Sequence, residues 1–229
     1  MTQLEHTSPT STHGKPSLED VAGGPEHLPG HTPTAGPETG PAANVLGDPL
    51  ALGLASFGVA ASVVGITNSG LVDPSVALVA PAAVLASGFL TLLIAGLVAF
   101  RRGETFVGVV FTSWSGFFLG IALLAVVFAP QIAAAGGPVG DAFGIYFIAW
   151  AVISTYHWIA AAATIKMNVV VFGLGTAALY VLGIAAFTGN LTLNNIGGWL
   201  LLATGVGQLY LSAATLINEM YRRRVLPVI

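Results

Sequence analysis

The stretch GDPLALGLASFGVAASVVGITNSG, residues 47–70, is where a polar, proline-rich segment ends and an apolar chain begins. Asp48 is a candidate helix N-cap, and Pro49 suits the first helical position, where its missing N–H would have no partner. The run that follows carries no charge up to Thr67, and at about 1.5 Å per residue it covers most of a hydrocarbon layer about 30 Å thick. Small residues fill this run and leave one aromatic side chain, Phe57. The stretch predicts a transmembrane helix at the start of a membrane domain.

The composition excludes a soluble globular protein. Only 7 % of the 229 residues are charged and the mean hydropathy is +0.83, whereas soluble proteins carry about 25 % charged residues. The chain has no cysteine, which excludes disulfides and thiolate metal sites. It also has no basic patch interleaved with aromatic residues, so we expect no nucleic-acid partner.

Residues 1–46 form the first predicted region, a disordered cytoplasmic tail. They contain seven prolines and six glycines without a repeat, a composition typical of disorder. Four histidines lie at irregular intervals in this tail, which favours solvated side chains over a metal site. The tail has no apolar core segment, so the first membrane helix is expected to act as its own insertion signal. Residues 47–229 form the second predicted region, a transmembrane domain.

The transmembrane domain contains six apolar segments, each near or above the roughly 20 residues that span a bilayer. They are residues 50–68, 75–100, 106–129, 142–165, 168–188 and 196–217. Positive charges follow the second segment (Arg101, Arg102), the fourth (Lys166) and the sixth (Arg222–Arg224). Six spans put all of these charges on one side, which the positive-inside rule makes cytoplasmic. We therefore predict an all-α, multi-pass protein of the plasma (inner) membrane, with six helices per protomer and both termini in the cytoplasm.

Polar residues on the first and last predicted helices share faces. Phe57 and Asn68 lie on one face of the first helix, and Gln208, Thr215 and Glu219 follow one line on the last. Polar groups inside a membrane are costly unless they are paired or face water. The line on the last helix is therefore typical either of a water-lined path or of a hydrogen-bonded seam between helices.

His157, on the fourth predicted helix, has an ordinary pKa near physiological pH. One interpretation makes it a proton relay, a role for which Glu219 is a second candidate. The other makes it a neutral histidine that is hydrogen-bonded to a neighbouring helix or subunit. Nothing else in the spans carries catalytic chemistry, because paired carboxylates, metal-ligand clusters and nucleotide fingerprints are absent from the sequence. We expect no enzyme activity, no metal and no cofactor.

Three motifs, in chain order, resemble the acetate uptake transporter family, which includes bacterial succinate–acetate permeases and fungal acetate permeases. The first is DPLALGLASF at 48–57, similar to the family's NPAPLGL followed by a Gly/Ala-Phe step. The second is RGETF at 102–106 with FTSW at 111–114, similar to KGNTF and FTSY. The third lies at the carboxyl end, with GW at 198–199, YL at 210–211, NE at 218–219 and VLP at 225–227.

The resemblance implies a six-helix protomer that forms a homo-hexamer in the lipid bilayer. Each protomer is then expected to hold its own path for acetate and related small monocarboxylates, with succinate as a further candidate. The family's hydrophobic constriction falls on Phe57, Trp114 and the neighbourhood of Leu174, where an ungapped match places Gly175 instead. Asp48 and Trp114 depart from the family pattern, and so does Gln208, at a position where the family tends to be small.

Carboxylate passage also makes a physical demand on the path. An acetate ion must shed water to cross, so the path needs neutral donors. The candidate donors are Asn68, Thr112, Ser113, Gln208 and Thr215. A gated anion channel and a proton-coupled uptake permease (a symport mechanism) both fit these residues. Two alternatives stay open: a channel for another small solute such as ammonia, and a non-transporting membrane sensor or scaffold.

Overall fold

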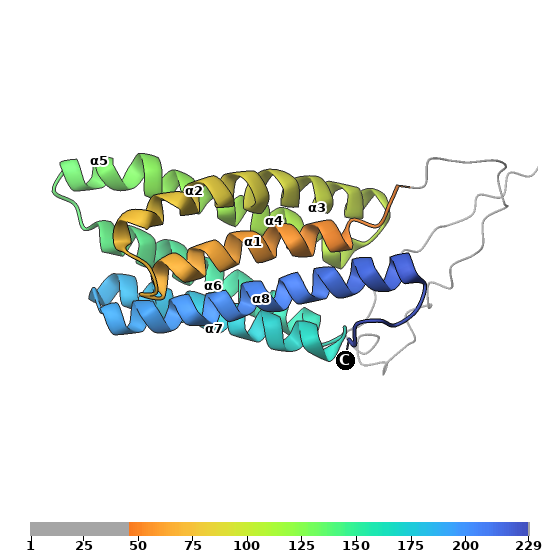
Figure 1. Cartoon of the computed structure of the whole chain (residues 1–229). Helices are drawn as coiled ribbons and strands as arrows, with labels where there is room; N and C mark the ends of the chain where they lie inside the picture. The colour runs from red at the N-terminus through yellow and green to blue at the C-terminus, as the bar shows by residue number, and fades with distance from the viewer. Residues whose placement is uncertain (1–45, 229) are drawn as a thin grey trace, which may run out of the picture. The chain divides into compact units, whose positions relative to one another are not determined.

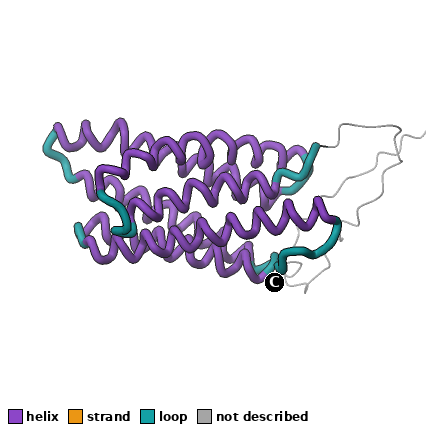
Figure 2. Tube along the Cα trace, viewed as in Figure 1, coloured by secondary structure: helices purple, strands orange, loops and turns teal. Residues whose placement is uncertain are grey.

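The computed structural model describes residues 46–228 of the chain, and within this part every regular element is a helix (Figures 1 and 2). The predicted disordered tail lies almost entirely outside the described residues. The elements are α1 Leu50–Asn68, η2 Pro74–Leu78, α2 Val79–Ala83, η3 Val84–Thr91, α3 Leu92–Arg101, α4 Thr105–Leu123, η4 Leu124–Phe128, α5 Ala129–Ala134, α6 Val139–Ala161, α7 Lys166–Thr188 and α8 Leu191–Tyr221.

These elements join into six rods, each long and apolar enough to cross a membrane. Four rods are the single helices α1, α6, α7 and α8, and the other two run through several elements each, Pro74–Arg101 and Thr105–Ala134. The rod Pro74–Arg101 includes the π-helical stretch η3, and the rod Thr105–Ala134 includes the shorter π-helical stretch η4. The predicted all-α fold with six spans is thus confirmed.

Several boundaries differ from the sequence prediction, and two of them have a clear local reason. The third rod continues past Pro130 because this proline occupies the first turn of α5, where a missing N–H costs little. The last helix starts earlier than predicted because the Asn190 side chain accepts a hydrogen bond from the Leu193 N–H (3.1 Å) and caps it. At α1 the bounds agree with the predicted segment, but the N-cap is Pro49 and not Asp48; Asp48 lies one residue outside the helix, where its Oδ1 accepts from the Leu50 N–H (2.8 Å).

Small residues bring α1 and α8 side by side, as Figure 1 shows in orange and blue. A Cβ atom built on Gly65 would lie 2.5 Å from the Leu202 backbone nitrogen, and one on Gly198 would lie 2.5 Å from the Asn68 carbonyl carbon. Backbone atoms cannot move aside as a flexible side chain does, so this contact requires glycine. The Ser212 hydroxyl then donates to the Ala51 carbonyl (2.6 Å) and ties the two helices together.

The two ends of the bundle differ in charge. The start of α1, the α3–α4 and α6–α7 connections and the end of α8 meet at one end (Figure 1). This basic end carries every positive side chain of the described part: Arg101, Arg102, Lys166 and Arg222–Arg224. Arg102 forms an ion pair with Glu104 there (2.7 Å), and this hydrogen bond raises the pKa of Arg102 further. The opposite, acidic end carries Asp73, directly before η2, and Asp141, in the first turn of α6.

Candidate functional site

A cavity of about 260 Å³ enters the bundle at the basic end, between α1, α4, α6, α7 and α8. Its wall is mostly apolar. The polar side chains that line it are uncharged: Ser154, Thr164, Asn168, Thr204, Gln208 and Thr215. The volume is just below the range of about 300–1,000 Å³ typical of sites for drug-sized ligands. This basic-end cavity therefore has room for a small organic ligand.

A second cavity, of about 770 Å³, lies at the acidic end. It is also largely apolar, and its polar lining consists of Thr67, Asn68, Ser75 and Asn194. Both π-helical rods border it, through Val84 of η3 and Val126 of η4. π-helical stretches often lie at functional sites, because they shift the register of the residues that follow.

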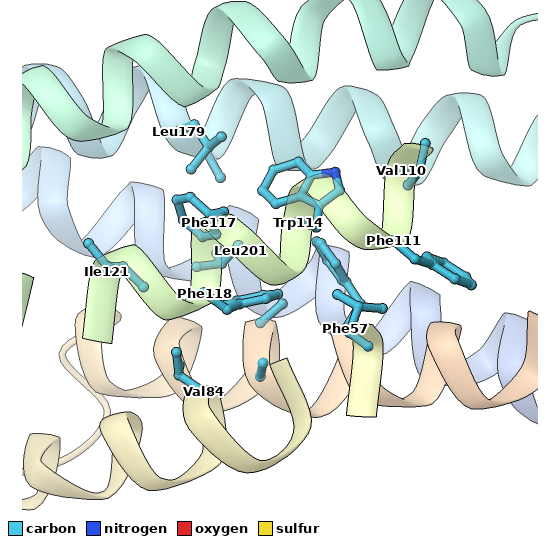
Figure 3. Packing of buried hydrophobic residues seen from close by; sticks show 14 of the residues in the cluster. Phe57, Val84, Val110, Phe111, Trp114, Phe117, Phe118, Ile121, Leu179 and Leu201 are labelled. Carbon is cyan, nitrogen blue, oxygen red and sulfur yellow. The ribbon is translucent and has the colours of Figure 1, made fainter. Parts of the chain in front are cut away.

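Four aromatic rings pack in the middle of the bundle: Phe57 of α1 and Trp114, Phe117 and Phe118 of α4 (Figure 3). The Phe57 ring stands edge-on to Trp114 (5.1 Å between centroids, 89°) and to Phe118 (5.4 Å, 68°). Phe117 makes similar contacts with Trp114 (5.2 Å) and Phe118 (5.2 Å). We call these four residues the aromatic barrier.

The aromatic barrier lies between the two cavities along the helices. On α4, Trp114 lines the basic-end cavity, Phe117 and Phe118 line neither, and Ile121 lines the acidic-end cavity. The same order repeats on two other helices. On α7, Gly175 lines the basic-end cavity, Leu179 is buried and lines neither, and Leu182 lines the acidic-end cavity. On α8, which runs in the opposite direction, the corresponding residues are Thr204, Leu201 and Asn194. The bundle thus contains two hollow ends separated by a centre of buried aromatic and aliphatic side chains.

Of the three predicted constriction residues, the structure brings Phe57 and Trp114 together. Leu174 is half-buried and lines neither cavity. On α7 the basic-end cavity is lined by the next residue, Gly175, and one turn on the fully buried Leu179 lies between the two cavities (Figure 3). One residue of shift rotates a side chain by about 100° around a helix, which is enough to turn Leu174 away.

The predicted polar residues separate into two groups. Gln208 and Thr215 line the basic-end cavity, and Asn68 lines the acidic-end cavity. Thr112 and Ser113 line neither. Their hydroxyls donate to carbonyls one turn back on α4, at 2.6 Å and 2.7 Å, as serine and threonine hydroxyls often do in helices. These two residues therefore depart from the prediction that they face the path.

The two candidate proton carriers lie apart from the cavities. His157 is 2 % exposed, neither ring nitrogen has a hydrogen-bond partner, and its side chain lines neither cavity. It lies one turn from Ser154 on the buried face of α6, and Ser154 does line the basic-end cavity. Glu219 is exposed at the end of α8. Among residues 46–228 no group of three acidic or histidine side chains is placed to hold a metal ion.

Sequence reasoning missed the role of the carboxyl-terminal segment. Asn218 Oδ1 accepts from the N–H groups of Val225 (2.7 Å) and Leu226 (2.9 Å), and its Nδ2 donates to the Leu226 carbonyl (2.9 Å). The Tyr210 hydroxyl donates to the Pro227 carbonyl (2.6 Å). These bonds fold the chain back so that its next residue, Val228, lines the basic-end cavity. The asparagine after the last apolar run was the available signal.

Sequence comparison places the chain among known membrane proteins. The sequence pattern of the GPR1/FUN34/yaaH family matches residues 31–229. The chain is 27 % identical over 183 residues to the succinate-acetate/proton symporter SatP of Escherichia coli (strain K12), covering 80 % of this chain and 95 % of that protein. An uncharacterized protein of Methanothermobacter thermautotrophicus is 28 % identical over 190 residues, covering 79 % of this chain and 90 % of the other.

Structural comparison gives the same result. The solved structure of the bacterial acetate channel SatP superposes with a TM-score of 0.72 at 26 % sequence identity, covering 80 % of this chain and 99 % of that one. The matched length is close to that of the whole described bundle. The chain belongs to the GPR1/FUN34/yaaH family.

Proposed function

We propose that this protein carries acetate and related small monocarboxylates, with succinate as a further candidate, across a membrane through a path inside each six-helix protomer. The relatives with a named activity are a succinate-acetate/proton symporter and an acetate channel. The observation that carries the proposal is the arrangement of two cavities on either side of the aromatic barrier, within a fold that matches an acetate channel. This is a transport path and not an enzyme active site.

The linings of the two cavities suit a weakly held carboxylate. None of the described residues that line them is charged. A fixed cation in a low-dielectric cavity would hold an anion too tightly for turnover, whereas hydroxyl and amide groups give it partial solvation. Gln208 supplies such a group in the basic-end cavity, whereas the Thr215 hydroxyl already donates to the Leu211 carbonyl (2.9 Å). In the acidic-end cavity the Asn68 amide supplies one, with its other N–H donated to the Val64 carbonyl (2.8 Å).

The aromatic barrier provides the gate. A constriction of buried rings holds no water, so an ion or acid crosses only when the rings move apart. Phe57 is the mobile candidate because it is contributed by α1, while the three other rings all belong to α4. In a proton-coupled version of the mechanism, His157 or Glu219 would carry the proton. His157→Gln should then abolish coupling, and intact coupling in this variant would remove His157 as the relay.

Position in the membrane follows from charge. We place the basic end, and with it both termini, in the cytoplasm, because positive loops are retained there. Large apolar side chains cover the outer faces of the bundle, among them Leu78 (84 % exposed) and Ile159 (69 % exposed). These faces would contact lipid or, in the homo-hexamer that the resemblance implies, neighbouring protomers.

Uptake by purified protein in proteoliposomes tests the proposal. Radiolabelled acetate should enter these vesicles faster than protein-free vesicles at two external pH values. Unlabelled propionate and formate should compete with it, and ammonium should not. Competition by ammonium alone would point to a channel for another solute. A protein that moves none of these solutes would be a sensor or a scaffold.

A further inference from the structure

The segment that follows α8 lies at the mouth of the basic-end cavity. α8 ends at Tyr221, and Arg222 adopts the left-handed backbone conformation (φ 49°), which turns the chain back toward the bundle. In Figure 1 this segment is dark blue and runs from the end of α8 across the basic end of the bundle. Its last described residue, Val228, lines the basic-end cavity.

The residues that line the cavity beside Val228 come from the ends of helices. Leu50 begins α1, Phe106 is the second residue of α4, and Ile165 is the N-cap of α7. These three positions all belong to the basic end of the bundle, whereas the aromatic barrier closes the inner end of the cavity. Val228 therefore lies at the mouth of the cavity and not at its floor.

The segment turns alternate side chains toward the bundle. Leu226 and Val228 are half-buried, whereas Val225 (43 % exposed) and Pro227 are exposed. A period of two is typical of an extended chain with one face packed. Val228 packs against the hydrophobic core of the bundle. The segment therefore covers part of the cavity mouth with an apolar face.

Two α8 side chains hold this segment in place. Asn218 makes three hydrogen bonds to it, and the Tyr210 hydroxyl donates to the Pro227 carbonyl (2.6 Å). Among the described residues, no backbone–backbone hydrogen bond joins residues 225–228 to the helices. A segment that is held by a few side-chain bonds and little apolar contact opens locally at a much lower free energy than a helix does.

We propose that residues 225–228 form a lid over the mouth of the basic-end cavity. Arg222 is its hinge, and Asn218 and Tyr210 are its latch. The structure shows the closed position, in which the lid narrows the mouth. When the latch bonds break, the segment moves away from the bundle and the mouth widens. The lid thus sets how fast a small solute exchanges between this cavity and the solution at the basic end.

The reactivity of a single thiol behind the lid tests the proposal. The chain has no native cysteine, and Thr215 lines the cavity, so Thr215→Cys places one thiol there. The measurement is the rate at which this protein, purified in detergent, reacts with a bulky, charged thiol reagent. Adding Tyr210→Phe removes one latch bond and should raise the rate about 2- to 12-fold, the effect of one hydrogen bond on the opening equilibrium. Asn218→Ala removes three bonds and should raise the rate further.

Two controls separate lid opening from general effects. Tyr221→Phe removes the hydroxyl of a tyrosine that is 65 % exposed and takes no part in the latch, so it should leave the rate of Thr215→Cys unchanged. Leu191→Cys places a thiol on an exposed site (76 %) at the opposite end of α8. This thiol should react at one rate whether or not the latch is intact.

A second thiol, Val228→Cys, reports movement of the segment itself, and Tyr210→Phe should raise its rate as well. Unchanged rates at both positions would show that Tyr210 latches nothing and would overturn the lid. A rate that rises for Val228→Cys and not for Thr215→Cys would show a segment that moves without covering the cavity, which also overturns the lid. None of these rates depends on transport, so a protein that moves no acetate would remove the proposed function and leave the lid standing.

Discussion

Truncating Phe57 to alanine should open the path between the two cavities. The Phe57 ring is 6 % exposed and makes edge-on contacts with Trp114 and Phe118, at 5.1 Å and 5.4 Å between centroids. Each aromatic contact of this kind contributes about 0.5–1.5 kcal/mol. Since the ring must leave both partners before a solute passes, Phe57→Ala should lower the barrier by about 1–3 kcal/mol, which corresponds to about 5- to 150-fold faster flux.

The assay is efflux of radiolabelled acetate from proteoliposomes that contain equal amounts of folded protein. Loss of a buried phenylalanine also destabilises a protein by about 3–5 kcal/mol, so each preparation should be checked by size-exclusion chromatography first. Phe128→Ala is the matched control, because Phe128 is 50 % exposed and lines neither cavity. Folded Phe57→Ala protein with wild-type efflux would refute the assignment of Phe57 as the gate.

Three further changes test the fold and its ends. Gly65→Ala should destabilise the protein by about 1–3 kcal/mol, because the added Cβ clashes with the α8 backbone. Gly116→Ala is the control, since its added Cβ meets nothing closer than 3.9 Å and should not destabilise the protein. Thermal unfolding in detergent compares the two variants, and equal unfolding temperatures would contradict the packing of α1 against α8. Asn218→Ala removes three hydrogen bonds to the segment that follows α8, so amide hydrogen exchange at residues 225–228 should become faster. Unchanged exchange would show that Asn218 does not hold this segment against the bundle. Hydrogen bonds from Ser75, in the η2 turn, lower the pKa of Asp73 from its ordinary 3.8. The ionised carboxylate therefore stabilises the turn fully above pH 3.8, and this stabilisation is lost as the pH falls through the lowered pKa. Amide exchange in the turn should rise over that pH range in the wild type, and Asp73→Asn should show no such rise.

The fold was predictable because the signals that set it are local. Length and hydropathy alone mark the six rods. Positive charges follow every second rod, which indicates that successive rods run in opposite directions. The errors in the prediction lie at the ends of helices, where a single capping side chain such as that of Asn190 determines where the first turn begins. The close contact of α1 with α8 through Gly65 and Gly198 depends on which helices are neighbours, and the sequence does not say which helices pair.

The site was only partly predictable, because rotation about a helix axis depends on tertiary packing. The resemblance located Phe57 and Trp114, yet a shift of one residue separates Leu174 from the cavity-lining Gly175. Hydroxyl content also misleads, because a serine such as Ser113 is satisfied by its own helix. On α8, Gln208 of the predicted polar line borders a cavity, while Ser212, on the adjacent face, donates to the Ala51 carbonyl of α1.

Thiol blocking tests most directly whether acetate passes through the basic-end cavity. The chain has no native cysteine, so Thr215→Cys places a single thiol on the cavity wall, and Met220→Cys places one on an exposed site (73 %) farther along the same helix. Complete modification with a bulky, charged thiol reagent should abolish acetate flux in Thr215→Cys and leave Met220→Cys unaffected. Undiminished flux through fully modified Thr215→Cys would contradict a path through this cavity.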